Sequence, residues 1–221
     1  ISDAKKLQED LSESNFKNLV SSWKKVEAIY FAGEIDNDYL DTPRYIDVFH
    51  NLKENLPKQM QRVIDSKDDV KISLYKNSFR TINALEYVLF NDEKLTTREK
   101  TIAVEILNTI ISNLKDIKEV YKTYLSSKPK SEKWENAMII NTLIASSYRL
   151  KEWRVGDASG YSSKYKNEPK DSRAEYFLSK NSFVAIRSIL EAHNEVIGNQ
   201  KFYNFSSMGN ENGASDQIKE S

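Results

Sequence analysis

The sequence predicts an all-α protein, a bundle of about six helices. Apolar residues recur along most of the chain with the i, i+3, i+4, i+7 spacing of a helix that turns one face toward a core. Gly occurs 6 times and Pro 4 times in 221 residues, so the chain offers few of the turns that a β-sandwich or a Gly-rich nucleotide-binding fold needs. Its 39% hydrophobic content is enough to form a core, which excludes a disordered chain.

Three predicted helices make up the first part of the chain. The first runs over 14–31, and a loop rich in Asp and Asn follows at 33–43. The second runs over 43–64 and contains Pro57, which should kink or break it because proline lacks the N–H that an inner helical turn needs. The third runs over about 74–90.

The longest predicted helix spans 97–126. Thr96 or Thr97 caps its first turn, and Glu99 lies where a negative charge favours a helix N-terminus. At ~1.5 Å per residue this helix is roughly 45 Å long. Leu114 lies midway along its apolar stripe and is therefore expected in the core.

The chain beyond this helix is expected to fall into different kinds of structure. A further helix begins after the capping residue Ser131 and ends near Trp153. Residues 154–179 then form the one long irregular stretch of the chain. Loops beyond ~15 residues are uncommon in compact domains and are often functional, so this stretch is a candidate binding loop.

The predicted organisation has three parts. Residues 1–153 form the helical bundle, 154–179 form the long loop, and 180–221 form an additional helix with a polar tail that should be frayed. The additional helix begins at Asn181 or Ser182. This last part is where a second bundle domain would start.

Composition excludes several classes of function. Lys+Arg and Asp+Glu both total 33, and this zero net charge argues against a nucleic-acid partner. The chain has no Cys, which excludes disulfides and thiolate zinc sites. Its 2 histidines, His50 and His193, exclude a three-histidine site, and we expect both to be structural. The Glu-x-x-His and His-Glu-x-x-His metal motifs and the Gly-rich phosphate-binding loops are absent.

A few polar residues lie close to the apolar stripes and are candidate site residues. Asn83 and Glu86 are three positions apart, so their side chains share one helix face. On spacing alone, Glu86 is expected at a solvent-exposed edge of its helix. Glu27 lies between apolar positions of the first helix and is expected to pair with a nearby lysine such as Lys24. Arg80 is available as an ion-pair partner.

Several segments carry a family resemblance. These are Trp23–Gly33 (WKKVEAIYFAG), Ile46–Phe49 (IDVF), Ala84–Phe90 (ALEYVLF), and Leu150 with Trp153 followed by Phe177–Ser179. They resemble the imelysin family, bacterial cell-envelope proteins that include an insulin-cleaving protease and relatives tied to iron uptake. The resemblance implies a helical fold, normally of two bundles, and a place in the periplasm or at the outer membrane.

The resemblance also implies a site, and the sequence departs from it at one position. The family signature is Gly-x-His-x-x-Glu, and Thr81, Asn83 and Glu86 occupy the three fixed places here. An amide at residue 83 cannot act as a general base and is a poor transition-metal ligand. The resemblance therefore implies ligand binding by Glu27, Arg80 and the pair Asn83 and Glu86, with Glu27 and Glu86 as metal ligands.

These observations lead to one expected function and two alternatives. We expect an exported cell-envelope protein that binds a small ligand or a metal ion, divalent or ferric, in connection with iron uptake and without hydrolysis. Its contact with the membrane would be only through a removed N-terminal anchor. The first alternative is a metallopeptidase with Glu86 as general base. The second is a helical interaction module for an envelope protein partner, marked by an exposed apolar helix face.

Overall fold

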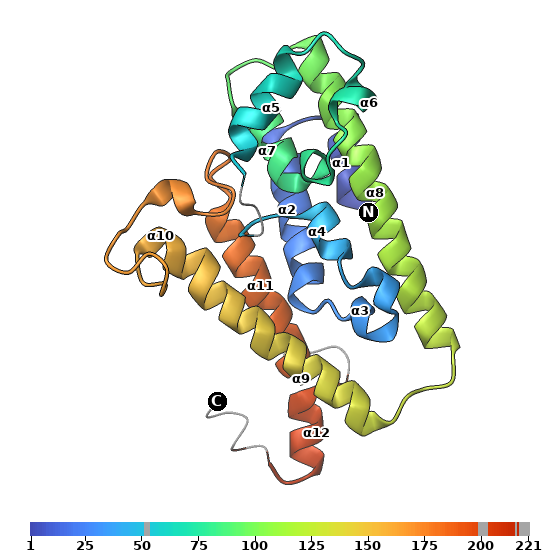
Figure 1. Cartoon of the computed structure of the whole chain (residues 1–221). Coiled ribbons are helices and arrows are strands. Elements are labelled where there is room, and N and C mark those ends of the chain that lie inside the picture. The colour runs from blue at the N-terminus through green and yellow to red at the C-terminus, as the bar shows by residue number, and fades with distance from the viewer. Residues whose placement is uncertain (51–53, 199–202, 215, 217–221) are drawn as a thin grey trace.

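A computed structural model describes residues 1–50, 54–198, 203–214 and 216, and these residues form helices without strands (Figure 1). The all-α prediction is confirmed. In the described ranges, the helices of eight residues or more are α1 (Ser2–Glu9), α2 (Glu13–Ala28), α5 (Leu56–Asp65), α7 (Ile82–Phe90), α8 (Thr97–Ser126), α9 (Glu132–Arg149) and α11 (Ser182–Ile197). The shorter ones are α3 (Ala32–Ile35), α4 (Thr42–Ile46), α6 (Val70–Ser73), α10 (Asp157–Ser159) and α12 (Phe205–Glu211).

Where a capping residue predicted the start of a helix, the structure confirms it. Thr96 caps α8 in a capping box, in which its backbone N–H donates to Glu99 Oε2 at 2.8 Å and its Oγ1 accepts from the Glu99 N–H. The Ser131 side chain accepts from the Trp134 N–H at the start of α9. Gly198 follows the last residue of α11.

Other boundaries differ from the predictions for identifiable reasons. Helix α2 ends at Ala28, before the predicted end at residue 31. The predicted second helix is two helices, because Pro57 lies in the first turn of α5 and the chain between α4 and α5 is not continuously helical. The third begins at Ile82 rather than near 74, because the Thr81 side chain caps it after a 3₁₀ turn.

The stretch predicted as a loop at 154–179 is more structured at its start than expected. Helix α9 continues into η3 (Leu150–Gly156), a π-helical segment, and then into α10. π-helical turns are rare and often lie at functional sites. The tail predicted to be frayed contains α12, and its last residues, 217–221, lie outside the described part of the chain.

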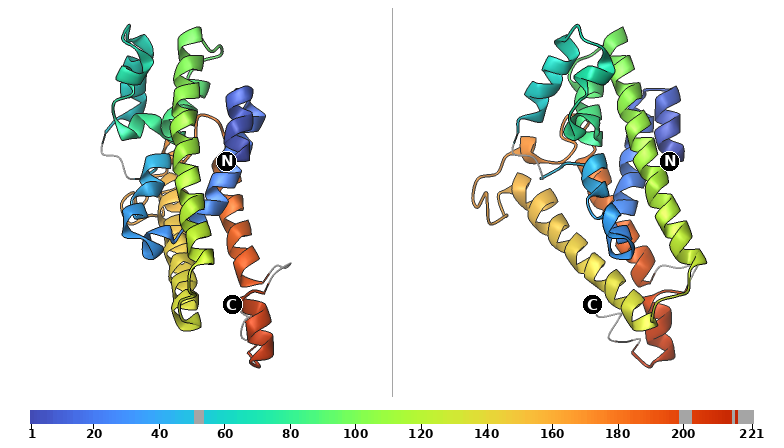
Figure 2. Two further views of the ribbon diagram at one scale, coloured as in Figure 1. Left: turned by 90° about the vertical axis from the view of Figure 1, so that its right-hand side faces the viewer. Right: turned by 45° about the vertical axis from the view of Figure 1, so that its right-hand side comes forward.

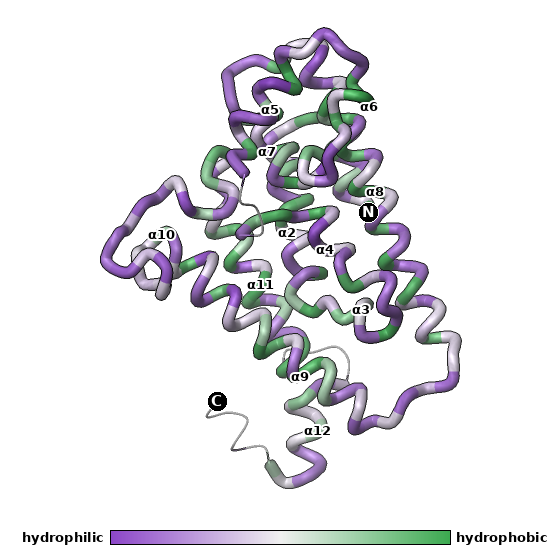
Figure 3. The backbone as a smooth tube through the Cα atoms, in the orientation of Figure 1, coloured by the Kyte–Doolittle hydropathy of each residue, from purple (hydrophilic) through white to green (hydrophobic). Residues whose placement is uncertain are grey.

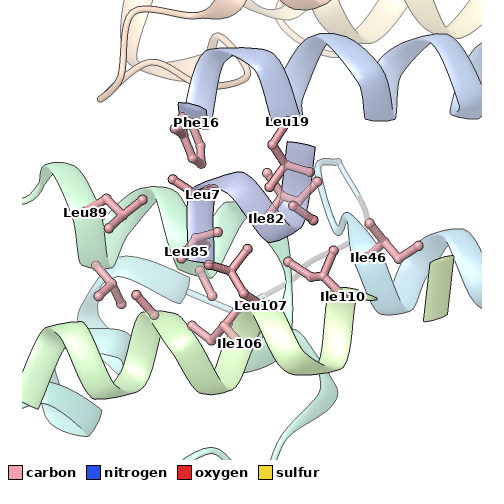
Figure 4. Close-up of a cluster of buried hydrophobic side chains, with 14 of the residues drawn as sticks. Leu7, Phe16, Leu19, Ile46, Ile82, Leu85, Leu89, Ile106, Leu107 and Ile110 are labelled. Carbon is pink, nitrogen blue, oxygen red and sulfur yellow. The ribbon is translucent and has the colours of Figure 1, made fainter. Parts of the chain in front are cut away.

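One apolar core joins most of the helices. Helix α8 contributes a buried row from Ile102 to Val120, and Leu114 lies in it at 9% exposure, as predicted. Figure 4 shows side chains of α1, α2, α7 and α8 packed together, among them Leu7, Phe16 and Ile106. Hydrophobic and hydrophilic residues alternate along the helices (Figure 3).

The arrangement of α8 and α9 creates the space in which the site lies. The two helices are joined by a short connection and diverge from it, with α2, α3 and α4 between them (Figures 1 and 2). Helix α11 packs along α2. The proposed division at residues 153 and 179 stays a prediction. No helix among the described residues has both the length and the apolar character needed to span a bilayer.

Candidate functional site

A buried ammonium group lies at the centre of the candidate site. Lys24 is fully buried, and its Nζ donates to Asp47 Oδ2 at 2.6 Å, Glu175 Oε1 at 2.5 Å and Glu27 Oε2 at 2.7 Å. An ammonium has three N–H donors, so the three carboxylates use its full capacity. A lysine is almost never buried without such partners, because desolvation of the charge is costly.

A second cation closes the network. Arg154 is buried, its Nε donates to Glu175 Oε2 at 2.8 Å, and its Nη2 lies 3.0 and 2.9 Å from the two oxygens of Glu27. Lys24, Glu27, Asp47, Arg154 and Glu175 form what we call the charge cluster. With every group ionised, it has three negative and two positive charges.

The residues of the charge cluster come from segments that are far apart in the sequence. Helix α2 carries Lys24 and Glu27 three positions apart on one face. Asp47 directly follows α4, Arg154 lies in the π-helical turn, and Glu175 lies on the segment that leads to α11. The cluster therefore fastens the irregular stretch to α2.

Tyr176 and Trp23 add hydrogen bonds to the same carboxylate. Asp47 Oδ2 accepts from the Tyr176 hydroxyl at 2.9 Å and from Trp23 Nε1 at 3.1 Å, and Asp47 Oδ1 accepts from the Phe49 N–H at 2.9 Å. Tyr176 has a φ of 55°, in the left-handed region that bulky residues rarely adopt. Such backbone strain is kept where the surroundings enforce it, and often lies at functional sites.

The charges of the cluster shift one another's pKa values. Burial and the Arg154 charge oppose protonation of Lys24, but the three carboxylates outweigh them and raise its pKa. Burial likewise opposes ionisation of Asp47, but Lys24 lowers its pKa far below the usual range. Burial, aided by the neighbouring carboxylates, raises the pKa of Glu175 to about 7 despite its two cationic partners. Burial and the excess negative charge thus make Glu175 the carboxyl of the cluster that takes up a proton first.

The four predicted site residues have different partners in the structure. Glu27 belongs to the cluster and pairs with Lys24, as expected. Asn83 Oδ1 accepts from the Val48 N–H at 2.7 Å, which fixes the backbone beside Asp47. The Arg80 Nε donates to a backbone carbonyl at 2.6 Å, and none of its hydrogen bonds or ion pairs within the described residues reaches the cluster.

The prediction of an exposed edge position for Glu86 is wrong. Glu86 is 7% exposed, and its Oε1 accepts from the backbone N–H and the hydroxyl of Ser179, at 2.9 and 2.8 Å. Burial raises the pKa of Glu86 against these two hydrogen bonds. Ser179 is distant in sequence, so the helical pattern around Glu86 could not show the segment that covers it.

The donor set does not match a metal centre. The family resemblance implies a metal, but the amide of Asn83 stands at the signature position of the histidine and its oxygen is bound to the backbone. The Glu27 carboxylate faces Lys24 and Arg154, cations that a metal ion would have to displace. Within the described residues, no group of three or more His, Cys, Asp or Glu side chains is arranged to hold a metal ion. Glu27 and Glu86 as metal ligands stay a prediction.

A cleft of about 720 Å³ opens above the charge cluster, between α9 and the α2–α4 segment. Glu27, Asp47 and Arg154 lie on its floor, and the remaining walls are mixed aromatic and polar. Its other lining residues are Tyr30, Phe31, Gly33, Glu34, Leu40, Asp41, Pro43, Arg44, Phe49, Met138, Asn141, Thr142, Ala145, Arg149 and Trp153. The volume is that of a small-molecule site, which is usually 300–1,000 Å³.

The two histidines have structural surroundings. His193 is buried, and its Nε2 lies 2.8 Å from Ser146 Oγ. The prediction placed His50 on a helix, but its φ of 65° is not helical. Its ring stacks on Trp153, and its Nε2 lies 2.9 Å from Asp157 Oδ2.

Sequence reasoning missed most of the charge cluster. One signal was present: Lys24 is four positions after Val20 and eight after Phe16, so it continues a buried row of α2. Glu175 lies in the stretch already singled out as long and irregular. Nothing local marks Arg154, whose role depends on its partners.

Comparison with known proteins gives one match. The sequence model of the imelysin family matches residues 4–217, which is nearly the whole described chain. No curated protein and no solved structure matches.

Proposed function

The chain belongs to the imelysin family, and we propose that within this family it is a ligand-binding protein of the cell envelope that does not hydrolyse peptides. The ligand is a small molecule that occupies the cleft between α9 and the α2–α4 segment. The envelope location and a connection with iron uptake rest on the family resemblance.

One observation carries this proposal: the polar groups on the cleft floor are already paired with one another. Both oxygens of Glu27 lie within 3.0 Å of Arg154 Nη2, and one of them also accepts from Lys24. A general base must have an oxygen free to take a proton from water. The charges on the floor instead largely compensate one another, which suits recognition of a ligand more than cleavage.

Glu86 does not line the cleft, so it is not placed to act as a general base on a molecule bound there. Its Oε1 serves two Ser179 donors, and the side chain is buried. The raised pKa of Glu86 follows from that burial. The proposed role of Glu86 is therefore to hold the segment that supplies Glu175 and Tyr176.

The experiment measures binding and cleavage on the same preparation. Thermal stability and native mass spectra are recorded with the low-molecular-weight fraction of a bacterial envelope extract, for the natural chain and for Ala145→Trp, which fills the cleft. The natural chain should gain a bound species and a higher melting temperature, and Ala145→Trp should gain neither. Insulin is the substrate in the cleavage assay, alongside a measurement of metal content. Cleavage that is lost in Glu86→Gln would overturn the proposal.

An interaction module is the second candidate, and a separate observation favours it. Residues 136–148 of α9 carry no charged side chain, although 30% of the chain is charged. Ile140, Ile144 and Tyr148 lie four positions apart on α9 and are 44%, 63% and 59% exposed. If an envelope protein partner binds there, Ile144→Glu should abolish its binding and leave ligand binding in the cleft unchanged.

A further inference from the structure

One arginine of the cleft has a side chain without a hydrogen-bond or ion-pair partner among the described residues. The other two cleft arginines are paired: Arg154 binds Glu27 and Glu175, and Arg44 lies 3.1 Å from Asp41. Arg149, the last residue of α9, lines the cleft, and its side chain forms no hydrogen bond or ion pair with the residues that the structure describes. A guanidinium carries five N–H donors in a planar fork that fits a carboxylate, sulfonate or phosphate.

The carboxylate that attracts the charge of Arg149 is occupied by other cations. Glu27 attracts its charge, but both Glu27 oxygens are already bound by Arg154 and one also by Lys24. Burial, with repulsion from Arg154, lowers the pKa of Arg149 in spite of Glu27. The protein therefore holds this guanidinium in the cleft without fully compensating its charge. A bound anion would compensate that charge.

The surroundings of Arg149 define the rest of the ligand. Met138, Thr142, Ala145 and Arg149 recur at intervals of three or four residues, so they form the face of α9 that borders the cleft. Aromatic rings line the cleft as well: Phe31, Phe49 and Trp153. An apolar, flat body fits between such walls, with an acidic group at the arginine end.

We infer that the ligand of the cleft is a small organic anion with an aromatic or similarly flat apolar body, and that Arg149 binds its acidic group. This inference rests on the proposed function, since it names the class of ligand for the same cleft. Arg149 is the residue that determines the preference for anions, while the aromatic walls supply affinity that does not depend on charge.

Two fluorescent dyes with the same ring system test the inference. The anionic probe is 8-anilino-1-naphthalenesulfonate, and the neutral probe is N-phenyl-1-naphthylamine, which lacks the sulfonate. Each is titrated against the natural chain, Arg149→Met, and the control Arg187→Met, an exposed arginine of α11 that does not line the cleft. Because Arg149 has no partner to lose among the described residues, Arg149→Met should fold.

The expected result is selective. Arg149→Met should weaken binding of the sulfonate dye about tenfold or more, which is the effect of losing one charge-assisted hydrogen-bond pair. Binding of the neutral dye should change by less than about twofold, and Arg187→Met should bind both dyes like the natural chain. Ala145→Trp should lose both dyes, which locates them in the cleft.

Other outcomes separate the inference from the proposed function. Suppose that the neutral dye binds in the cleft. If Arg149→Met then binds the sulfonate dye as tightly as the natural chain does, or loses affinity for both dyes equally, the anion preference is wrong while the cleft remains a binding site. If neither dye binds, or Ala145→Trp leaves both bound, the cleft does not take such molecules and the inference fails together with its premise. A loss of sulfonate dye in Arg187→Met equal to that in Arg149→Met would assign the effect to surface charge and overturn the inference.

Discussion

The Lys24 ammonium lies 2.6 Å from Asp47 Oδ2, and the same oxygen accepts from Tyr176 and Trp23. This contact connects α2 with the chain that follows α4, and Glu175 extends it to the segment before α11. A charged pair at such depth stabilises the fold only while all its members are present, because each removed group leaves the others unpaired.

Lys24→Met should therefore be strongly destabilising. The variant keeps most of the apolar stem but leaves three carboxylates, two of them buried, facing one another, with Arg154 as their remaining cation. We expect a loss of about 3–5 kcal/mol in the free energy of unfolding, measured by denaturant titration.

The neighbouring lysine provides the matched control for this variant. Lys25 is 38% exposed and pairs with Glu191 at 3.0 Å. An exposed ion pair contributes about 0–1 kcal/mol, so Lys25→Met should change stability by no more than that. Equal losses in the two variants would show that the Lys24 contacts do not hold the site together.

The stability of the natural chain should fall as pH rises from about 5 to 7 through the titration of Glu175. Its pKa in the folded state is raised to about 7 from 4.5, so the folded state holds a proton that the unfolded state has released across this range. Unfolding then becomes more favourable with rising pH.

Comparison with Glu175→Gln isolates this effect. Titratable groups that are present in both proteins contribute to both, so their contribution cancels in the difference between the unfolding free energies. The advantage of the natural chain over Glu175→Gln should shrink between pH 5 and 7. An advantage that is constant or grows over that range contradicts the raised pKa.

The ends of the helices were predictable where the signal is local. Thr96, Glu99 and Ser131 act within three residues of their own positions, and the structure uses all three as the sequence indicates. Pro57 also acts locally: it lies in the first turn of α5, where its missing N–H would have no helical partner. The apolar period of α8 likewise predicted which of its faces is buried.

The candidate site was much less predictable because its contacts are long-range. Lys24 and Glu175 are 151 positions apart, and Glu86 and Ser179 are 93 apart. Spacing along one helix shows that a carboxylate borders an apolar stripe, but not whether another segment covers it. For the same reason, the exposed position expected for Glu86 was wrong, while the pairing of Glu27 with a lysine one turn away was right.

Replacement of Glu86 should separate its hydrogen bonds from its charge. Glu86→Gln keeps an oxygen that accepts from Ser179 and removes a charge that burial disfavours, so stability at pH 7 should be unchanged or higher. Glu86→Ala leaves the Ser179 donors unpaired and should lose about 1–3 kcal/mol. Denaturant titration of both variants measures this difference. If Glu86→Gln loses as much as Glu86→Ala, the negative charge itself is required at this position.

Two leucines of α8 allow a test of the helical phase on which the fold depends. Leu114 lies in the buried row at 9% exposure, whereas Leu125 on the same helix is 83% exposed. Leu114→Ala should lose about 2–5 kcal/mol, because the deleted methyl groups leave a cavity in the core. Leu125→Ala should stay within about 0.5 kcal/mol, since no such cavity forms at the surface. Denaturant midpoints compared at an unchanged m-value measure both, and a small loss in Leu114→Ala would mean that α8 turns a different face toward the core.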